Sequence, residues 1–248
     1  MRILAIDTST RTASVAVLGG AREVEIDHAV GSHSDDLVAL LDRALGDAGL
    51  ALAALDAVAV GAGPGSFTGL RIGMATAKGL CFAAGLPLWL VSSLAALALD
   101  AADTLAAADP PEDAAGALFV PVLDARRGEV FTGIYRAASS GVIAVAPDAV
   151  IPIAGVAAAV ADALARTGSS RAILVGDGLD SHAAALATAG EVVAGARSTP
   201  SARSVGRLAA IGDRADALKL GTPIYIRPSE AEVKFPDGNR GGHRSDKQ

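Results

Sequence analysis

An aspartate followed by three hydroxyl residues is the first group in this chain whose types and spacing suggest chemistry: Asp7, Thr8, Ser9 and Thr10. Hydroxyls and turn amides can face a phosphate group while a carboxylate holds a hydrated magnesium ion. The same residues also make a good structural turn, because their side chains readily hydrogen-bond nearby backbone groups. Residues 7–10 are therefore candidates for nucleotide contact, with a purely structural turn as the alternative.

The most informative stretch is a glycine-rich loop at residues 61–73. It reads Gly61-Ala62-Gly63-Pro64-Gly65-Ser66-Phe67-Thr68-Gly69-Leu70-Arg71-Ile72-Gly73. A phosphate-binding P-loop needs Gly-Lys-Ser/Thr after its spacer, but the first lysine of this chain is Lys78. A serine nucleophile elbow needs Gly-x-Ser-x-Gly, but Thr68 stands where the second glycine belongs. The loop therefore predicts close docking of another surface rather than phosphate binding or hydrolysis.

Residues 68–84 are predicted to form a helix that continues from this loop. Gly69, Gly73 and Ala77 fall at i, i+4 and i+8, so they form one smooth face. A mid-helix glycine costs about 1 kcal/mol relative to alanine, which indicates that another backbone packs closely there. That backbone belongs either to a partner helix, which we favour, or to this chain itself. The predicted partner interface consists of Gly65, Phe67, Thr68, Gly69, Arg71, Ile72, Gly73 and Ala77.

Histidines and carboxylates elsewhere in the sequence do not form a set of metal ligands. The four histidines are scattered, and the single cysteine, Cys81, excludes an intramolecular disulfide and a cysteine-built zinc site. Asp177 and Asp180 could hold magnesium, but a Gly-Asp-Gly turn is more often plain turn chemistry. Asp124, Arg126, Arg127 and Glu129 surround a predicted hairpin turn. They form either an interlobe or partner-facing charge network or a solvated hairpin end, and we predict no metal site.

Composition sets wide limits on the class of protein. With 248 residues, 51% of them apolar, the chain can bury one large core or two smaller ones. A net charge of −6 disfavours tight binding of nucleic acid by the chain alone. No basic region precedes an apolar stretch at the N-terminus, and breaks at Gly-Leu-Pro and Ser-Ser interrupt the uncharged residues 79–99. We therefore expect a cytoplasmic protein without a membrane span.

Strands and helices are predicted to alternate in a first lobe at residues 1–105. Its expected strands are 3–7, 13–18, 22–28, 57–61 and 88–91. Its expected helices are 35–48, 68–84 and one that begins after Ser92 or Ser93.

A second lobe is predicted at residues 106–228, after a linker rich in Ala, Asp and Pro at 101–116. A hairpin at 118–123 and 129–136 echoes the first lobe. Further expected elements are a strand at 171–175, helices at 153–166, 182–189 and 204–217, and an extended segment at 223–228. The last helix is free to pack back on the first lobe, and residues 229–248 are expected to be a disordered tail.

Six blocks of sequence carry a resemblance to a known family. They are Ile3-Leu4-Ala5-Ile6-Asp7-Thr8-Ser9-Thr10, His33-Ser34, the stretch 63–73 quoted above, Ala77-Lys78-Gly79-Leu80, Val91-Ser92-Ser93-Leu94 and Asp124-Ala125-Arg126-Arg127-Gly128-Glu129-Val130. Over residues 1–135, and again at 223–228, the chain closely resembles the bacterial TsaB family, formerly called YeaZ. The resemblance implies an α/β fold of two actin-like lobes (ASKHA, ribonuclease H-like) with mixed sheets flanked by helices.

The resemblance also implies a function. It implies a non-catalytic subunit that pairs with the catalytic homologue TsaD, together with the ATPase TsaE, in transferring a threonylcarbamoyl group to a tRNA adenosine. It implies no cofactor of the chain's own, ATP or ADP held jointly with partners, tRNA contact only through the complex, and homodimerisation as an option for the isolated chain. The catalytic relatives bind a metal through His-x-x-x-His, whereas here His33 is followed by Leu37, which cannot ligate.

A small-molecule kinase or ATPase of the actin-like superfamily is the alternative function. Such an enzyme would need a second hydroxyl-rich phosphate loop in the second lobe. Residues 124–128 place two arginines there instead. We therefore predict a scaffold subunit rather than an enzyme.

Overall fold

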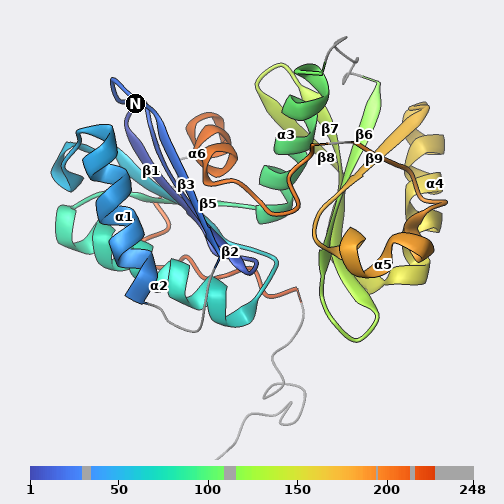
Figure 1. Ribbon diagram of the computed structural model, residues 1–248, viewed down its shortest axis with the longest axis horizontal. Helices are drawn as coiled ribbons and strands as arrows, with labels where there is room; N and C mark the ends of the chain where they lie inside the picture. The colour runs from blue at the N-terminus through green and yellow to red at the C-terminus, as the bar shows by residue number, and fades with distance from the viewer. Residues whose placement is uncertain (30–34, 109–115, 194, 213–215, 227–248) are drawn as a thin grey trace, which may run out of the picture.

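Two five-stranded sheets face each other across a central pair of helices (Figure 1). The computed structural model describes residues 1–29, 35–108, 116–193, 195–212 and 216–226. The first sheet has the order β3-β2-β1-β4-β5, with bounds Val24–Ala29, Thr12–Leu18, Ile3–Asp7, Ala57–Gly61 and Leu88–Val91. The second has the order β10-β9-β6-β7-β8, with bounds Glu191–Val192, Arg171–Val175, Ala117–Asp124, Glu129–Ala138 and Gly141–Pro152.

The two sheets repeat one topology. In the first, β1 pairs antiparallel with β2 and β2 with β3, whereas β1 pairs parallel with β4 and β4 with β5. In the second, β6, β7, β8, β9 and β10 repeat those pairings in the same order. The predicted two-lobe α/β fold with mixed sheets is therefore confirmed.

Four helices cover the outer faces of the two sheets (Figure 1). Helices α1 (Asp35–Ala48) and α2 (Phe67–Ala84) pack on the first sheet. Helices α4 (Val156–Thr167) and α5 (Gly178–Leu186) pack on the second. Single turns of 3₁₀ helix at Leu52–Ala54 and Ile153–Gly155 precede β4 and α4.

The two central helices are exchanged between the lobes. Helix α3 (Ser93–Ala106) follows β5 of the first sheet, yet its buried leucines and alanines pack against β6, β7 and β9 of the second. Helix α6 (Ala202–Ile211) follows the second sheet, yet it packs against β1, β2 and β4 of the first. Its small buried residues permit a close approach, and a Cβ at Gly206 would meet a Leu18 methyl at 2.0 Å. The helix that covers the inner face of each sheet therefore comes from the other half of the chain.

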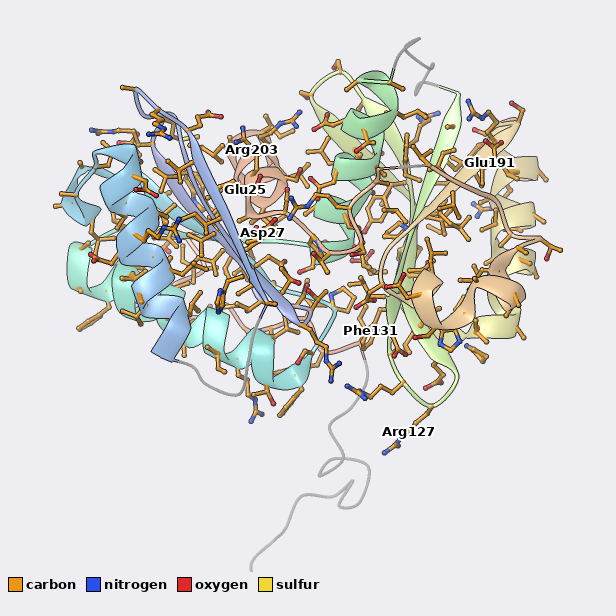
Figure 2. The ribbon with its side chains drawn as sticks, in the orientation of Figure 1. Glu25, Asp27, Arg127, Phe131, Glu191 and Arg203 are labelled. Carbon is orange, nitrogen blue, oxygen red and sulfur yellow. The ribbon has the colours of Figure 1, made fainter. Side chains whose placement is uncertain are left out.

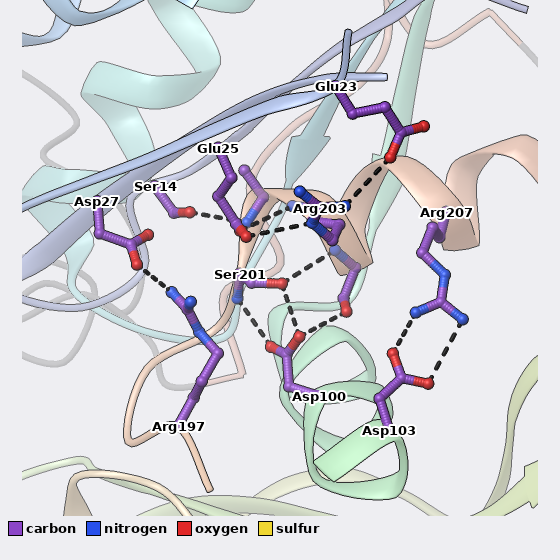
Figure 3. A network of polar contacts seen from close by, with 12 residues as sticks. Ser14, Glu23, Glu25, Asp27, Asp100, Asp103, Arg197, Ser201, Arg203 and Arg207 are labelled. Carbon is purple, nitrogen blue, oxygen red and sulfur yellow. Dashed lines mark hydrogen bonds and ion pairs between the residues drawn. The ribbon is translucent and has the colours of Figure 1, made fainter. Parts of the chain in front are cut away.

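A buried carboxylate joins the exchanged helices (Figure 3). Asp100 of α3 accepts hydrogen bonds from the Ser201 amide at 2.9 Å, the Ser201 hydroxyl at 2.6 Å and the Ser204 hydroxyl at 2.6 Å. Ser201 is also the N-cap of α6, because its hydroxyl accepts from the Ser204 amide. Burial raises the pKa of Asp100 to about 6, although its hydrogen bonds act in the opposite direction. The junction between the lobes thus depends on one desolvated acid.

Ion pairs surround this buried junction (Figure 3). Arg197 pairs with Asp27 of β3 at 2.6 Å. Arg203 of α6 pairs with Glu23, which directly precedes β3, and with Glu25 of β3. Arg207 pairs with Asp103 of α3. Because these ion pairs are partly exposed, each contributes little to the stability of the fold. Together they hold α6 and the segment before it against elements of both lobes.

Several predicted boundaries were wrong. Helix α3 runs through Ala106, so the linker predicted from residue 101 begins later, because Ala101 and Leu105 bury against the second sheet. Helix α5 begins at Gly178 rather than 182, and α6 spans Ala202–Ile211 rather than 204–217. The strands β8 and β10 were not predicted. His33, Ser34 and the tail 229–248 lie outside the described residues.

None of the helices in the described ranges combines the length and the apolar character that crossing a bilayer requires.

We predict that acidification stabilises the wild-type protein relative to an Asp100→Asn variant. The folded pKa of Asp100 is about 6 and the unfolded value is 3.8, so the folded state binds more protons between these values. Stability from this group therefore rises as pH falls through 6, by up to roughly 3 kcal/mol. Urea unfolding of both proteins at pH 7.5, 6 and 4.5 measures the difference. A difference that does not change with pH would contradict the prediction.

Candidate binding cleft between the lobes

The Asp7 turn, predicted as a candidate phosphate loop, is sealed inside the first lobe. The Asp7 carboxylate is 0% exposed and accepts hydrogen bonds from the Ser9 amide at 2.8 Å and from the Ser9 and Ser93 hydroxyls, each at 2.6 Å. Burial raises the pKa of Asp7 above its ordinary value, against these hydrogen bonds. Thr8 is also buried, and Thr10 alone of the four remains partly open to solvent. The Asp7 carboxylate therefore accepts hydrogen bonds from the turn and from Ser93.

The glycines of the loop and of α2 make this sealing possible. A Cβ at Gly65 would lie 2.2 Å from the Ser9 carbonyl oxygen, and one at Gly69 would lie 2.0 Å from that of Thr8. A Cβ at Gly73 would lie 2.2 Å from the Thr8 hydroxyl. The Ser66 amide donates to the Ser9 carbonyl at 2.7 Å, and the Thr8 hydroxyl donates to the Gly69 carbonyl at 2.8 Å. The backbone that approaches the small face of α2 is thus the chain's own first turn.

The predicted partner interface is consequently divided by the structure. Gly69, Gly73 and Ala77 face the interior, which corrects the preference for a partner helix on this face. Ile72 is half-buried against the first core. The remaining predicted residues line a cleft between the lobes: Gly65, Phe67, Thr68 and Arg71.

The cleft has a volume of about 960 Å³ and is lined by both lobes. The first lobe contributes residues 9–11, 64–68 and Arg71, and the second contributes residues 123–126, Phe131 and the start of α5. Figure 2 shows Phe131 of β7 between the two lobes and Arg127 at the tip of the β6–β7 hairpin. Residues 224–226 complete the wall. The sequence alone identified the loop, but not the cleft that it borders.

An arginine in contact with two aromatic side chains lies in the wall of the first lobe. The Arg71 guanidinium carbon lies 3.8 Å from the centroid of the Phe67 ring, and the Phe67 and Tyr225 rings are 5.2 Å apart. The Arg71 Nε donates a hydrogen bond to the Tyr225 hydroxyl at 3.1 Å. Tyr225 is held there because the Ile224 amide donates to the Ala62 carbonyl at 2.7 Å. Tyr225 is a cleft residue that sequence reasoning missed, although it lies within the extended segment predicted at 223–228.

Carboxylates gather on the wall of the second lobe. The Asp177 carboxylate accepts a hydrogen bond from the Asp124 amide at 3.0 Å, and Asp180 lies in the same lining. Burial raises the pKa of Asp177, and the negative charges of Asp124 and Asp180 add to this effect. His182 approaches Asp124 at 3.9 Å. Within the described residues, no group of three or more His, Cys, Asp or Glu side chains is placed to hold a metal ion.

The repeated strand order, the exchanged central helices and the interlobe cleft define a two-lobe α/β protein of the actin-like class. A Bacillus subtilis protein named tRNA threonylcarbamoyladenosine biosynthesis protein TsaB is 31% identical over 97% of this chain and 100% of its own length. The chain belongs to the TsaB (YeaZ) family. Residues 25–216 also match the family described as TsaD: tRNA N6-adenosine threonylcarbamoyltransferase.

Other relatives agree with this assignment. The Haemophilus influenzae protein of the same name is 38% identical over 53% of this chain, and the match spans 52% of the relative. The structure described as YeaZ from Pseudomonas aeruginosa has a TM-score of 0.67 and 30% identity, and covers 84% of this chain and 90% of that one. A second Pseudomonas aeruginosa structure, described as similar to peptidase YEAZ, has a TM-score of 0.72 and 29% identity over 91% of this chain and 99% of that one.

We predict opposite effects of alanine at two glycines of α2. Gly69→Ala forces a Cβ toward the Thr8 carbonyl and should reduce the free energy of unfolding by about 1–3 kcal/mol. Gly79→Ala is the matched control, because a Cβ there meets open space and should raise stability by up to about 1 kcal/mol. Urea denaturation compares the two. Equal stability of Gly69→Ala and the wild type would show that α2 does not press on the first turn.

Proposed function

We propose that this chain is a non-catalytic subunit that pairs with a TsaD homologue in the biosynthesis of threonylcarbamoyladenosine in tRNA, in the cytoplasm. The names of its relatives indicate the biosynthesis of threonylcarbamoyladenosine in tRNA. The observation that carries the proposal is the position of α2, whose small face packs against the Asp7 turn, the candidate phosphate loop, while its opposite face is open to solvent. A loop closed in this way supports a scaffold rather than the alternative, a small-molecule kinase or ATPase.

The outer face of α2, together with α1, is the docking surface that we propose for the TsaD homologue. Phe82 is 84% exposed and Val38 of α1 is 61% exposed, although both are large apolar residues. Ala75 and Gly79 are also exposed, and their helical spacing places them on the side of α2 that carries Phe82. Unlike Gly69, Gly79 has no internal neighbour that requires a glycine. A partner helix that packs closely on this face would account for both the exposed apolar residues and the small ones.

The proposed assembly has further members. The ATPase TsaE joins the pair, tRNA is contacted only through the complex, and the isolated chain can use the same outer face to form a homodimer. ATP or ADP is held jointly with the partners, since the buried Asp7 and Ser9 offer this chain no open phosphate loop of its own.

Phe82→Asp should abolish copurification with the TsaD homologue and leave the fold intact. A charge on an apolar docking surface is desolvated on binding, so the affinity should fall at least tenfold. Copurification and light scattering measure the loss. Ile143→Asp is the control, because Ile143 is 53% exposed on β8 of the second lobe and lies away from α2. Equal binding by the Phe82 variant and the wild type would remove this face as the docking surface.

Calorimetry of the isolated chain should detect no micromolar binding of ATP. The Asp7 carboxylate already accepts hydrogen bonds from the Ser9 and Ser93 hydroxyls, so phosphate binding would require α2 to move off the turn. A Thr10→Ala variant, changed at the one partly open residue of the turn, should give the same result as the wild type. Micromolar affinity lost in this variant would favour the kinase or ATPase.

A further inference from the structure

Most arginines in the described part of the chain form an ion pair with a carboxylate of the same chain. Those in ion pairs are Arg2, Arg43, Arg166, Arg171, Arg197, Arg203 and Arg207. Three others, Arg11, Arg71 and Arg126, are exposed and line the interlobe cleft, and none of them forms an ion pair with a residue in the described ranges. These three arginines form no such pair although Asp124, Asp177 and Asp180 line the same cleft. The cleft therefore concentrates cationic groups that remain available to a ligand.

Aromatic rings accompany these cations. Phe67 and Tyr225 are 39% and 42% exposed, and Arg71 lies on the Phe67 ring. The ring contact and the hydrogen bond from Nε to Tyr225 fix the plane of the guanidinium while its terminal nitrogens remain free to donate to an anion. A planar arginine beside an exposed ring is the surface on which unstacked nucleobases stack in complexes with single-stranded RNA.

The hairpin that carries Arg126 supports a ligand-binding role. Arg126 and Arg127 have φ values of 61° and 58°, and Gly128 follows at 76°. Turns with successive positive φ angles are formed at least cost by Asn, Asp and Gly. Arginine at both positions is locally unfavourable, and of the two Arg126 lines the cleft.

We propose that the rim of this cleft binds a single-stranded segment of the tRNA, with phosphates on Arg11, Arg71 and Arg126 and a base against the Phe67–Tyr225 pair. The inference rests on the proposed function, because it names the tRNA-contacting surface of this subunit within the complex. The net charge of −6 keeps the affinity of the isolated chain low, so the contact acts only once the partners contribute.

An acidic protein segment is the competing occupant, and the cleft favours RNA over it. Asp124, Asp177 and Asp180 repel the negative charges of either occupant, but only RNA offers base amino groups from which they can accept hydrogen bonds. The exposed rings also have no counterpart in a polyglutamate chain, but they match the faces of bases.

The test uses the assembled complex and a fluorescent, unmodified transcript of a tRNA that reads codons beginning with A. A triple variant, Arg11→Gln, Arg71→Gln and Arg126→Gln, should assemble as the wild type does and bind the transcript at least tenfold more weakly at 0.15 M salt. The slope of log affinity against log salt should fall by about 2, as expected for three lost contacts to single-stranded phosphates. Tyr225→Ala should weaken binding severalfold with the salt slope unchanged.

The matched control removes the same charge elsewhere. Arg22→Gln and Arg136→Gln change two exposed arginines outside the cleft that form no ion pair within the described residues, and Arg166→Gln adds a third, which pairs with Asp162. This triple variant should leave the affinity within twofold. An assembled cleft variant with wild-type affinity and salt slope would overturn the proposal while the proposed function stands. A cleft variant that keeps the wild-type affinity for the transcript but loses binding of polyglutamate would overturn it in favour of an acidic segment. Failure of the wild-type chain to assemble with the TsaD homologue would instead refute the proposed function, and this inference with it.

Discussion

The contact between the backbone of α2 and the first turn is the constraint on which the rest of the first lobe depends. Glycines 65 and 69 bring carbonyl oxygens of Ser9 and Thr8 closer to the loop and the helix than any side chain would permit. That approach buries Asp7, which then needs the hydroxyls of Ser9 and Ser93 as donors. The same contact directs Phe67 and Arg71 to the cleft and leaves the far side of α2 uncovered. A segment built like a phosphate loop thus makes internal hydrogen bonds of the first lobe.

A second constraint comes from the exchange of α3 and α6. Because both helices lie between the sheets, the separation of the lobes is set by side chains that meet there, chiefly Asp100 with Ser201 and Ser204. The cleft opens beyond this joint and is closed on one side by Ile224 and Tyr225, which return to the first lobe. The walls of the cleft are therefore held by contacts formed far away in the sequence, and no single lobe defines it.

Much of the fold could be predicted because its strands are apolar runs between strong turn signals. The bounds of β1, β4, β5 and β9 agree residue for residue with the prediction. Strand β8 was missed because its exposure does not alternate and Pro147 interrupts it, as suits an edge strand. The spacing of Gly69 and Gly73 correctly indicated a close contact, but the contact is with Thr8, about 60 residues earlier, whose carbonyl faces Gly69 and whose side chain faces Gly73. Helical spacing carries no information on which backbone approaches, so the pattern alone could not separate a partner from the chain's own turn.

The exchange of helices also has a consequence for synthesis of the chain on the ribosome. The first sheet is complete once β5 has emerged, but its inner face is covered mainly by α6, which begins at Ala202. Until then, Ala5, Ala16 and Ala59 present an apolar surface with no covering helix, and α3 likewise awaits the second sheet. The N-terminal half cannot mature as an independent folding unit during translation, in contrast to the usual behaviour of sequential domains. Nascent chains of this protein should therefore remain clients of chaperones until almost the whole polypeptide has been made.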